Sequence, residues 1–221
     1  LTVLYFVKFR FLTALPVVLW NAFCCNRDKY GRYMSIGLVL GAIGDATLSA
    51  SFITGLLFFL ANHVVDIYAF KLSNPQFSWV TLIVGAIYCI CVGIVILPSV
   101  DFAMIAPCAV YLVTLVYTCC LAIDRYVSGE DISTYSSVLG IVGSVMFVAS
   151  DTLLAYSMFV GTSAALEESE AIMLTYFLAQ LSLALSSFID QPQSVLMAGE
   201  EDSPADKSED YLGAHLLSGG V

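Results

Sequence analysis

The chain is a series of long apolar runs separated by short polar stretches. A run of about 20 residues is long enough for a helix to cross a hydrocarbon layer of about 30 Å. Such runs lie near residues 8–24, 33–50, 53–70, 78–97, 102–123, 135–159 and 171–189. They are apolar on every face except for single polar residues, whereas a transmembrane barrel requires alternating polar and apolar positions. The pattern therefore predicts an all-α fold, a polytopic transmembrane helix bundle with seven spans.

The composition supports this prediction and divides the chain into two parts. Hydrophobic residues make up 59% of the sequence and charged residues 12%, which is more apolar than a water-soluble protein of this size requires. We expect residues 1–190 to form the transmembrane domain. Residues 191–221 are rich in Asp, Glu, Ser, Pro and Gly and are predicted to be a disordered, acidic, cytosolic tail.

This tail carries about half of the net charge of −10, so that charge does not identify a partner. We expect the protein to be surrounded by the lipid bilayer and to have no nucleic-acid partner. The sequence leaves the oligomeric state open.

The basic residues predict the orientation in the membrane. The second, fourth and sixth loops contain no Lys or Arg, and by the positive-inside rule the opposite side is cytosolic. The exceptions are Lys8 and Arg10, which open the first span on the non-cytosolic side and either reach harmlessly to the interface or meet an anionic head group. The remaining cations lie in the first, third and fifth loops and the tail, namely Arg27, Lys29, Arg32, Lys71, Arg125 and Lys207.

Two aspartates, Asp45 and Asp151, lie inside long apolar runs. A charge at the centre of a membrane helix costs about 3 kcal/mol on insertion scales, so such residues are functional candidates. Asp45 shares a helix face with Gly37 and Gly41, and Asp151 shares one with Ser144. Small residues allow close helix approach, so both aspartates should point into the bundle. The alternative is that each only ties helices together by hydrogen bonds.

Two further spans add polar groups at a similar depth. In the third span His63 and Asp66 share a face with Asn62 beside it, and in the last span Tyr176 and Gln180 are one turn apart. Counted at about 1.5 Å per residue from the non-cytosolic ends, these groups and the two aspartates lie in a common layer. The layer predicts one polar cavity open to the non-cytosolic side or to the outer leaflet. Alternatively, Asp66 only pairs with His63, and Tyr176 and Gln180 only join helices.

The supply of metal ligands argues against a metalloenzyme. The seven cysteines lie within or at the ends of apolar runs, where we expect free packing thiols. A membrane zinc hydrolase requires several histidines, and this chain has only His63 and His215. We therefore expect no metal site and no cofactor.

Four short motifs on successive polar helices resemble one family. They are Gly44-Asp45, then G-L-L-F-F-L-A-N-H ending at His63, then Ser150-Asp151-Thr-Leu-Leu-Ala, then T-Y-F-L-A-Q ending at Gln180. In this order they are similar to the YhhN-like lysoplasmalogenase family, over roughly residues 8–189. The resemblance implies an eight-helix membrane hydrolase that cleaves the vinyl ether bond of lysoplasmalogens, releasing a fatty aldehyde and glycerophosphoethanolamine or glycerophosphocholine. In animal relatives the location is the endoplasmic reticulum membrane.

The sequence departs from the family pattern in three places. The chain begins at Leu1 with residues that are already apolar, so the first family helix is expected to be missing. Asn62 stands where a small residue is expected, and Asp66 where relatives often carry Tyr. Both aspartates are nevertheless in place.

The side chains suit the implied chemistry. A vinyl ether hydrolyses by protonation of its β-carbon, and water captures the resulting oxocarbenium ion. We hypothesise that Asp45 and Asp151 are the catalytic pair, one donating the proton while the other stabilises the cation and activates water, as paired carboxylates do in glycosidases. The lysophospholipid substrate would be bound by His63, Asn62, Asp66, Tyr176 and Gln180, with Lys8 or Arg10 on its phosphate.

Two other function classes stay open. Asp124-Arg125-Tyr126 is reminiscent of seven-span receptors, although it follows the fifth span and no N-P-x-x-Y motif accompanies it. A proton-coupled transporter would also use buried Asp and His, with inverted repeats as its signature. No convincing inverted halves occur in the sequence.

Overall fold

The computed structural model describes residues 28–48, 50–128, 133–161 and 165–189. Within these residues the regular elements are all helical, which confirms the predicted fold class. The predicted first span, the acidic tail and the boundary near residue 190 lie outside the described residues. The elements are α2 (Lys29–Leu48), α3 (Phe52–Lys71), α4 (Trp79–Ile96), the 3₁₀-helix η1 (Leu97–Ser99), α5 (Phe102–Ser128), α6 (Thr134–Phe159) and α7 (Ala165–Ile189).

The described α-helices correspond to six of the seven predicted spans. Five segments are long and apolar enough to cross a membrane: α3, α4 together with η1, α5, α6, and residues Glu170–Ser187 of α7. α2, which begins with polar and basic residues, is not among them. These helices indicate a multi-pass membrane protein, whereas the number of seven spans stays a prediction.

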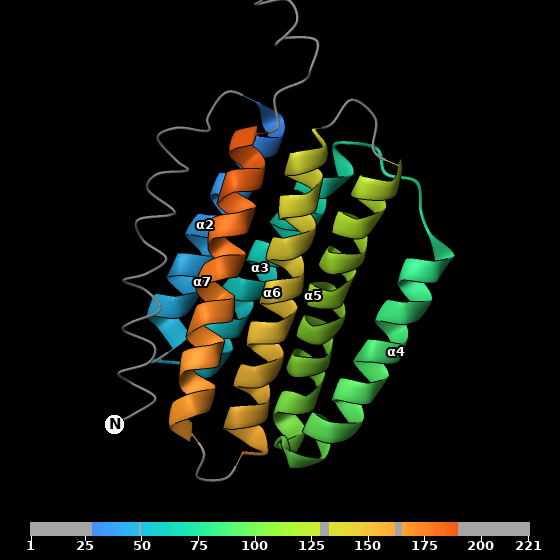
Figure 1. Ribbon diagram of the computed structural model, residues 1–221. Helices are drawn as coiled ribbons and strands as arrows, with labels where there is room; N and C mark the ends of the chain where they lie inside the picture. Colours follow the sequence, from blue (N-terminus) through green and yellow to red (C-terminus); the bar gives the residue numbers. More distant parts are fainter. Residues whose placement is uncertain (1–27, 49, 129–132, 162–164, 190–221) are drawn as a thin grey trace, which may run out of the picture. The chain divides into compact units, whose positions relative to one another are not determined.

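Successive helices run in opposite directions and are joined by short connections (Figure 1). The start of α2 and the ends of α3 and α5 therefore lie at one end of the bundle, at the top of Figure 1. Lys29, Arg32 and Lys71 are at this end, as the charge pattern predicted. The last residues of α2, α4 and α6 lie at the opposite end.

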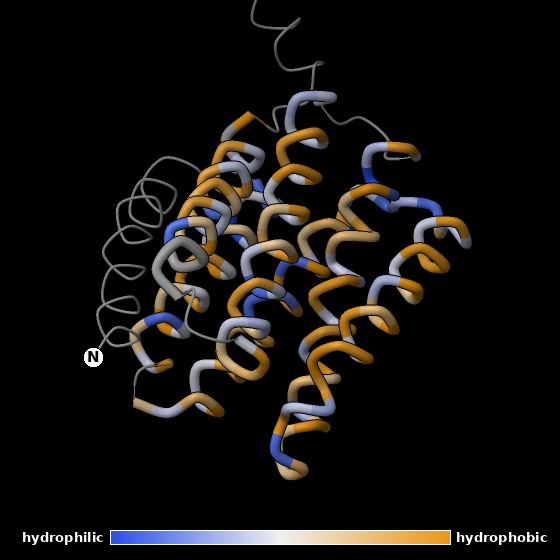
Figure 2. Tube along the Cα trace, turned by 60° about the horizontal axis from the view of Figure 1, so that its bottom comes forward, coloured by the Kyte–Doolittle hydropathy of each residue, from blue (hydrophilic) through white to orange (hydrophobic). Residues whose placement is uncertain are grey.

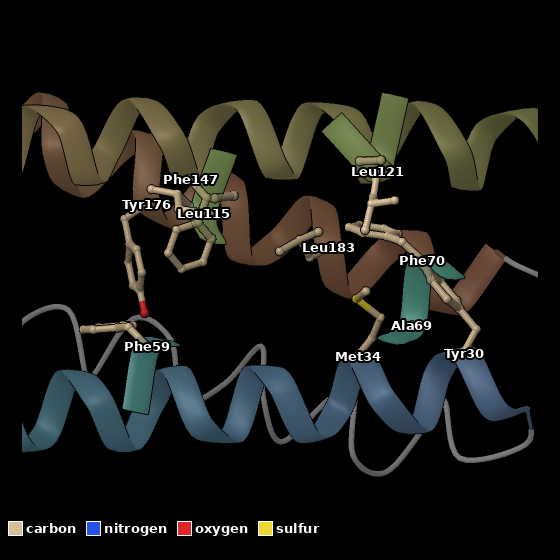
Figure 3. Close-up of a cluster of buried hydrophobic side chains, with 12 residues drawn as sticks. Tyr30, Met34, Phe59, Ala69, Phe70, Leu115, Leu121, Phe147, Tyr176 and Leu183 are labelled. Carbon is tan, nitrogen blue, oxygen red and sulfur yellow. The ribbon is translucent and has the colours of Figure 1, made fainter. Parts of the chain in front are cut away.

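The interior is filled where α2, α3, α5, α6 and α7 meet. Phe59, Phe70, Phe147 and Tyr176 belong to one buried cluster that runs along the bundle (Figure 3). α4 stands at the edge of the bundle, packs on α5, and presents apolar side chains outward, with Ile94 70% exposed. Figure 2 shows mainly apolar helices interrupted by short polar stretches. Outward apolar surface of this kind suits a lipid environment.

Glycines allow two helix pairs to approach closely. A Cβ atom at Gly37 of α2 would lie 2.5 Å from Asp66 Oδ1 of α3, and one at Gly143 of α6 would lie 2.7 Å from Leu183 Cγ of α7. Both distances are shorter than any ordinary carbon contact. The close packing of α2 on α3 and of α6 on α7 therefore depends on these small residues.

Arg125 does not lie in a loop, contrary to the sequence interpretation, because α5 continues to Ser128. Its guanidinium is buried and donates hydrogen bonds to Ser73 Oγ at 2.9 Å and to Tyr30 Oη at 3.2 Å. It also lies 4.1 Å from the centre of the Tyr30 ring, within cation–π distance. These contacts draw the last turn of α5 into the bundle and extend the helix beyond the apolar run.

Asp124, in the same triplet, holds the start of α4. Its carboxylate accepts hydrogen bonds from the Ser78 amide at 3.3 Å and from Thr81 Oγ1 at 2.7 Å. Ser78 is itself the N-cap of α4. The Asp124-Arg125 pair thus has a structural role at this end of the bundle.

Candidate functional site

A large apolar pocket opens at the end of the bundle where α2 meets α3 and α4 meets α5. Its empty volume is about 770 Å³, including the part that opens to its surroundings. Apolar side chains such as Leu56, Val92, Leu112 and Leu154 form most of its wall. Its size and apolar lining are typical of a small-molecule or lipid-chain site.

A carboxyl group and a phenol are the main polar groups in this wall. Asp151 of α6 and Tyr111 of α5 both line the pocket, and the Tyr111 hydroxyl donates a hydrogen bond to Asp151 Oδ2. Asp151 is half-buried. The predicted catalytic Asp151 therefore lies in an apolar pocket, where it can contact a bound molecule.

His63 and Asp66 continue the row behind Tyr111, away from the large pocket. His63 Nε2 lies 3.2 Å from Tyr111 Oη, at hydrogen-bond distance. On the other side of the ring, His63 Nδ1 lies 3.8 Å from Asp66 Oδ2. Both side chains are buried and line a second, small pocket together with Thr118 and Ser144.

The second predicted catalytic residue, Asp45, belongs to another group. Asp45 is fully buried, and Tyr176 of α7 donates a hydrogen bond to its Oδ2. Gln180 Nε2 donates in turn to Tyr176 Oη at 2.9 Å. Figure 3 shows the Tyr176 hydroxyl pointing from α7 toward α2. Asn62 is buried on the adjoining face of α3, where its Oδ1 would lie 2.8 Å from a Cβ atom at Gly37.

The ring of Phe147 lies between the two groups. Its centroid is 4.9 Å from that of His63 and 5.5 Å from that of Tyr176, in edge-on contact with both. Of the residues predicted to share one polar cavity, only Asp151 lines the large pocket, and the others lie behind it in two buried groups on either side of Phe147. Because Asp45 and Asp151 each accept from a different tyrosine, direct pairing of their carboxyl groups stays a prediction.

Sequence reasoning did not single out Tyr111. It is one of twelve tyrosines and lies in an apolar run without another acidic or basic group nearby. The available signal is its spacing from Cys108 and Leu115, which places the three residues on one face that lines the pocket. The predicted phosphate ligands, Lys8 and Arg10, lie outside the described residues.

The described side chains of the site are suited to hydrogen bonding and proton transfer. In the described part of the chain, no three or more His, Cys, Asp or Glu side chains are grouped so that they could hold a metal ion. The groups available are three carboxyls, two phenols, an imidazole and two amides. Such a set can donate, accept and pass protons.

Comparison with known proteins places the chain in a family. The chain is 40% identical over 68 residues to a protein from Dictyostelium discoideum named "Lysoplasmalogenase homolog", a match that covers 29% of this chain and 22% of that relative. No solved structure matches the chain. The model of the YhhN family matches residues 5–187, which include the pocket and both aspartates. Because that match covers most of the sequence, the chain belongs to the YhhN family.

Proposed function

We propose that the protein is a lysoplasmalogenase, a membrane hydrolase that cleaves the vinyl ether bond of lysoplasmalogens. The products would be a fatty aldehyde and glycerophosphoethanolamine or glycerophosphocholine. The observation that carries the proposal is the hydrogen-bonded pair of Asp151 and Tyr111 in the wall of a large apolar pocket. A lysoplasmalogen has one long apolar chain with the vinyl ether at its polar end. The apolar chain suits the apolar wall of the pocket, and the vinyl ether would then lie beside Asp151 and Tyr111.

Asp151 is the proposed acid. Its carboxyl group donates a proton to the β-carbon of the vinyl ether, the carbon that begins the apolar chain. The double bond supplies the electrons for the new C–H bond, and an oxocarbenium ion forms at the neighbouring carbon. The carboxylate that remains stabilises this cation and accepts a proton from the water that captures it. The hemiacetal then collapses to aldehyde and alcohol.

Asp45 is the proposed second carboxyl of the site. It accepts a hydrogen bond from the Tyr176 hydroxyl, and Gln180 donates a hydrogen bond to the same oxygen. Asp45 is fully buried, and the Phe147 ring lies between its partner Tyr176 and His63. Asp45 and Asn62 do not line the large pocket, so we propose that Asp45 stabilises the positive charge through space, with Asn62 beside it, without touching the substrate.

A polar head group does not suit the mainly apolar wall of the pocket, so we propose that it lies outside this space. Lys8 and Arg10 are the proposed ligands of its phosphate, since a Lys or Arg makes charge-assisted hydrogen bonds to such a group. The proposed location is the endoplasmic reticulum membrane, where the single-chain substrate can enter from the bilayer.

The test is aldehyde release by purified protein from an alkenyl lysophospholipid, with the saturated alkyl ether and the acyl lysolipid assayed beside it. Wild type should release aldehyde from the alkenyl lipid alone. D151N should lose about 10²- to 10⁴-fold in kcat, the usual contribution of a general acid. D45N should also lose activity.

The matched control is D124N, since Asp124 is a buried aspartate that accepts hydrogen bonds from the start of α4 at the opposite end of the bundle. This variant should retain aldehyde release. The proposed function is wrong if wild type releases no aldehyde, and flux of a solute in proteoliposomes would then favour a transporter. Near wild-type activity in D151N would contradict the assignment of the acid.

A further inference from the structure

We propose that Asp66, His63 and Tyr111 form a proton relay that ends at Asp151 and keeps its carboxyl group supplied with a proton. The relay rests on the proposed function, because it serves the acid that protonates the vinyl ether. It assigns His63 and Asp66 a role different from direct substrate contact. Neither residue lines the large pocket, and Tyr111 stands between them and Asp151.

The contacts form a continuous row from the interior of α3 to the pocket. Tyr111 Oη contacts both Asp151 Oδ2 and His63 Nε2, the latter at 3.2 Å. His63 Nδ1 and Asp66 Oδ2 face each other at 3.8 Å, so a slightly closer approach makes this contact a hydrogen bond. After that approach, every neighbouring pair in the row can exchange a proton.

If the imidazole of His63 is neutral, the hydrogens along the row place a proton on Asp66. A phenol has one hydrogen, so when Tyr111 donates to Asp151 it must accept from His63 Nε2. A neutral imidazole with hydrogen on Nε2 has a bare Nδ1, which requires a donor. Asp66 Oδ2 is the polar atom that faces it, and it can donate when the carboxyl group is protonated.

The same heavy atoms allow a second, reversed arrangement. Here Asp151 holds the proton and donates to Tyr111, Tyr111 donates to His63 Nε2, and Nδ1 donates to the carboxylate of Asp66. Moving from the first arrangement to the second shifts one hydrogen at each contact and transfers one proton from Asp66 to Asp151. The imidazole stays neutral and only exchanges tautomers.

The burial of His63 and Asp66 favours a relay over the alternative that the two residues only pair with each other. His63 Nδ1 and Asp66 Oδ2 are buried and make no hydrogen bond at the distances of the structure. Leaving a buried polar atom unsatisfied costs about 1–3 kcal/mol. In the relay a proton moves between these two atoms, so each atom is alternately a donor and an acceptor. This exchange explains why two polar atoms without a hydrogen bond face each other in the interior.

The surroundings isolate this exchange. The gap beside the pair is lined by Thr118, Ser144 and apolar side chains, none of which titrates near neutral pH. The titratable groups that face His63 from the packed helices are Tyr111 of α5 with Asp151 of α6 behind it, and Tyr176 of α7 across the Phe147 ring. The proton is therefore directed toward the pocket.

Protons balance over one turnover. One proton leaves Asp151 for the β-carbon, and one is returned to the Asp151 carboxylate by the water whose oxygen bonds to the oxocarbenium carbon. Between turnovers the relay can move this proton from Asp151 to Asp66. It returns the proton to Asp151 before the next substrate reacts. No further reactant is required.

The experiment is a double-mutant cycle on kcat and KM for the alkenyl lysolipid, using D66N, Y111F and the double variant. Asn at position 66 preserves size and can donate to Nδ1 but cannot pass a proton onward. We expect D66N to lower kcat by about 10- to 100-fold, within the usual range for proton transfer, while KM changes less than twofold. Because the residues act as a unit, the double variant should be no slower than Y111F.

D124N again serves as the matched control and should retain kcat. Equilibrium unfolding in mixed micelles checks the fold of each variant, and H63Q replaces D66N in the cycle if D66N does not fold. A wild-type kcat in D66N, or losses that multiply in the double variant, would overturn the relay while aldehyde release by wild type upholds the proposed function. Absence of aldehyde with wild type would overturn both.

Discussion

Asp45 and Asp151 occupy similar positions in the sequence pattern but different environments in the bundle. Asp151 is half-buried and lines the large pocket, whereas Asp45 is fully enclosed. In each case a tyrosine from another helix donates to the carboxyl group. Such donors offset part of the cost of placing a carboxyl group in a low-dielectric environment. Two phenols therefore make both aspartates tolerable within apolar helices.

Removing the hydroxyl of Tyr176 tests this account at the level of one atom. Y176F leaves the ring packed against Phe147 but deprives Asp45 of a donor and Gln180 Nε2 of an acceptor. We expect the free energy of unfolding to fall by about 1–3 kcal/mol, measured by equilibrium unfolding in mixed micelles. Y156F, at a position 41% exposed on α6, should have little effect. Equal stability of the two variants would contradict a buried hydrogen-bonded role for Tyr176.

At the scale of helices, the site depends on how closely α2 and α3 approach. Gly37 lies against the Asp66 and Asn62 side chains, and Gly41 lies against Gln180, so both glycines make room for polar groups of neighbouring helices. Small residues in a membrane helix thus serve two purposes here: they allow close packing and they leave space for the polar layer.

A methyl group at Gly37 should disturb this packing. In G37A the new Cβ would lie 2.5 Å from Asp66 Oδ1, and overpacking of this kind typically costs about 1–3 kcal/mol. The loss should appear in the free energy of unfolding in mixed micelles. G93A provides the comparison, because its Cβ would meet Leu97 Cδ1 at an ordinary 3.5 Å and Ala favours the helix. A G37A protein as stable as G93A would show that α2 and α3 do not require this close contact.

At the scale of the whole described bundle, the large pocket results from the position of α4 at the edge. α4 packs mainly on α5 (Figure 1). The residues that line the pocket come mainly from α4, the first half of α3, the first half of α5 and the end of α6. Its wall combines segments far apart in the sequence, from Leu48 to Phe159. An apolar chain in this space would stabilise the bundle by mass action.

Binding of a saturated alkyl ether lysolipid, which has no vinyl ether to hydrolyse, tests the pocket. At about 100 times its Kd the lipid should raise the free energy of unfolding by about 2.7 kcal/mol. L112W should reduce this stabilisation, because the larger side chain fills the pocket that Leu112 lines.

V113W is the neighbouring control, since Val113 is 58% exposed on the outer side of the same helix. It should bind the lipid as wild type does. Unchanged stabilisation in L112W would place the lipid chain elsewhere. The comparison is made by thermal unfolding in detergent with and without lipid.

The helical elements could be predicted closely from the sequence, but the site only in part. Asp45, Tyr176 and Gln180 could be anticipated because each is a polar residue inside an apolar run at a recognisable helical spacing. Tyr111 could not, since nothing in its own helix distinguishes it. The extension of α5 to Arg125 was likewise missed, because the partners of its guanidinium are on other helices.

The amino-acid sequence by itself determined that this chain forms apolar helices and that a few polar groups lie at similar depth on their inner faces. Both follow from local properties, namely run length, hydropathy and the helical repeat. Only the tertiary structure decided that Asp151 meets Tyr111 at an apolar pocket, that Asp45 is enclosed with Tyr176, and that His63 and Asp66 stand behind Tyr111. The rotation and neighbours of each helix decide these contacts, because side-chain packing between helices, rather than the pattern along any one of them, selects which inner faces touch.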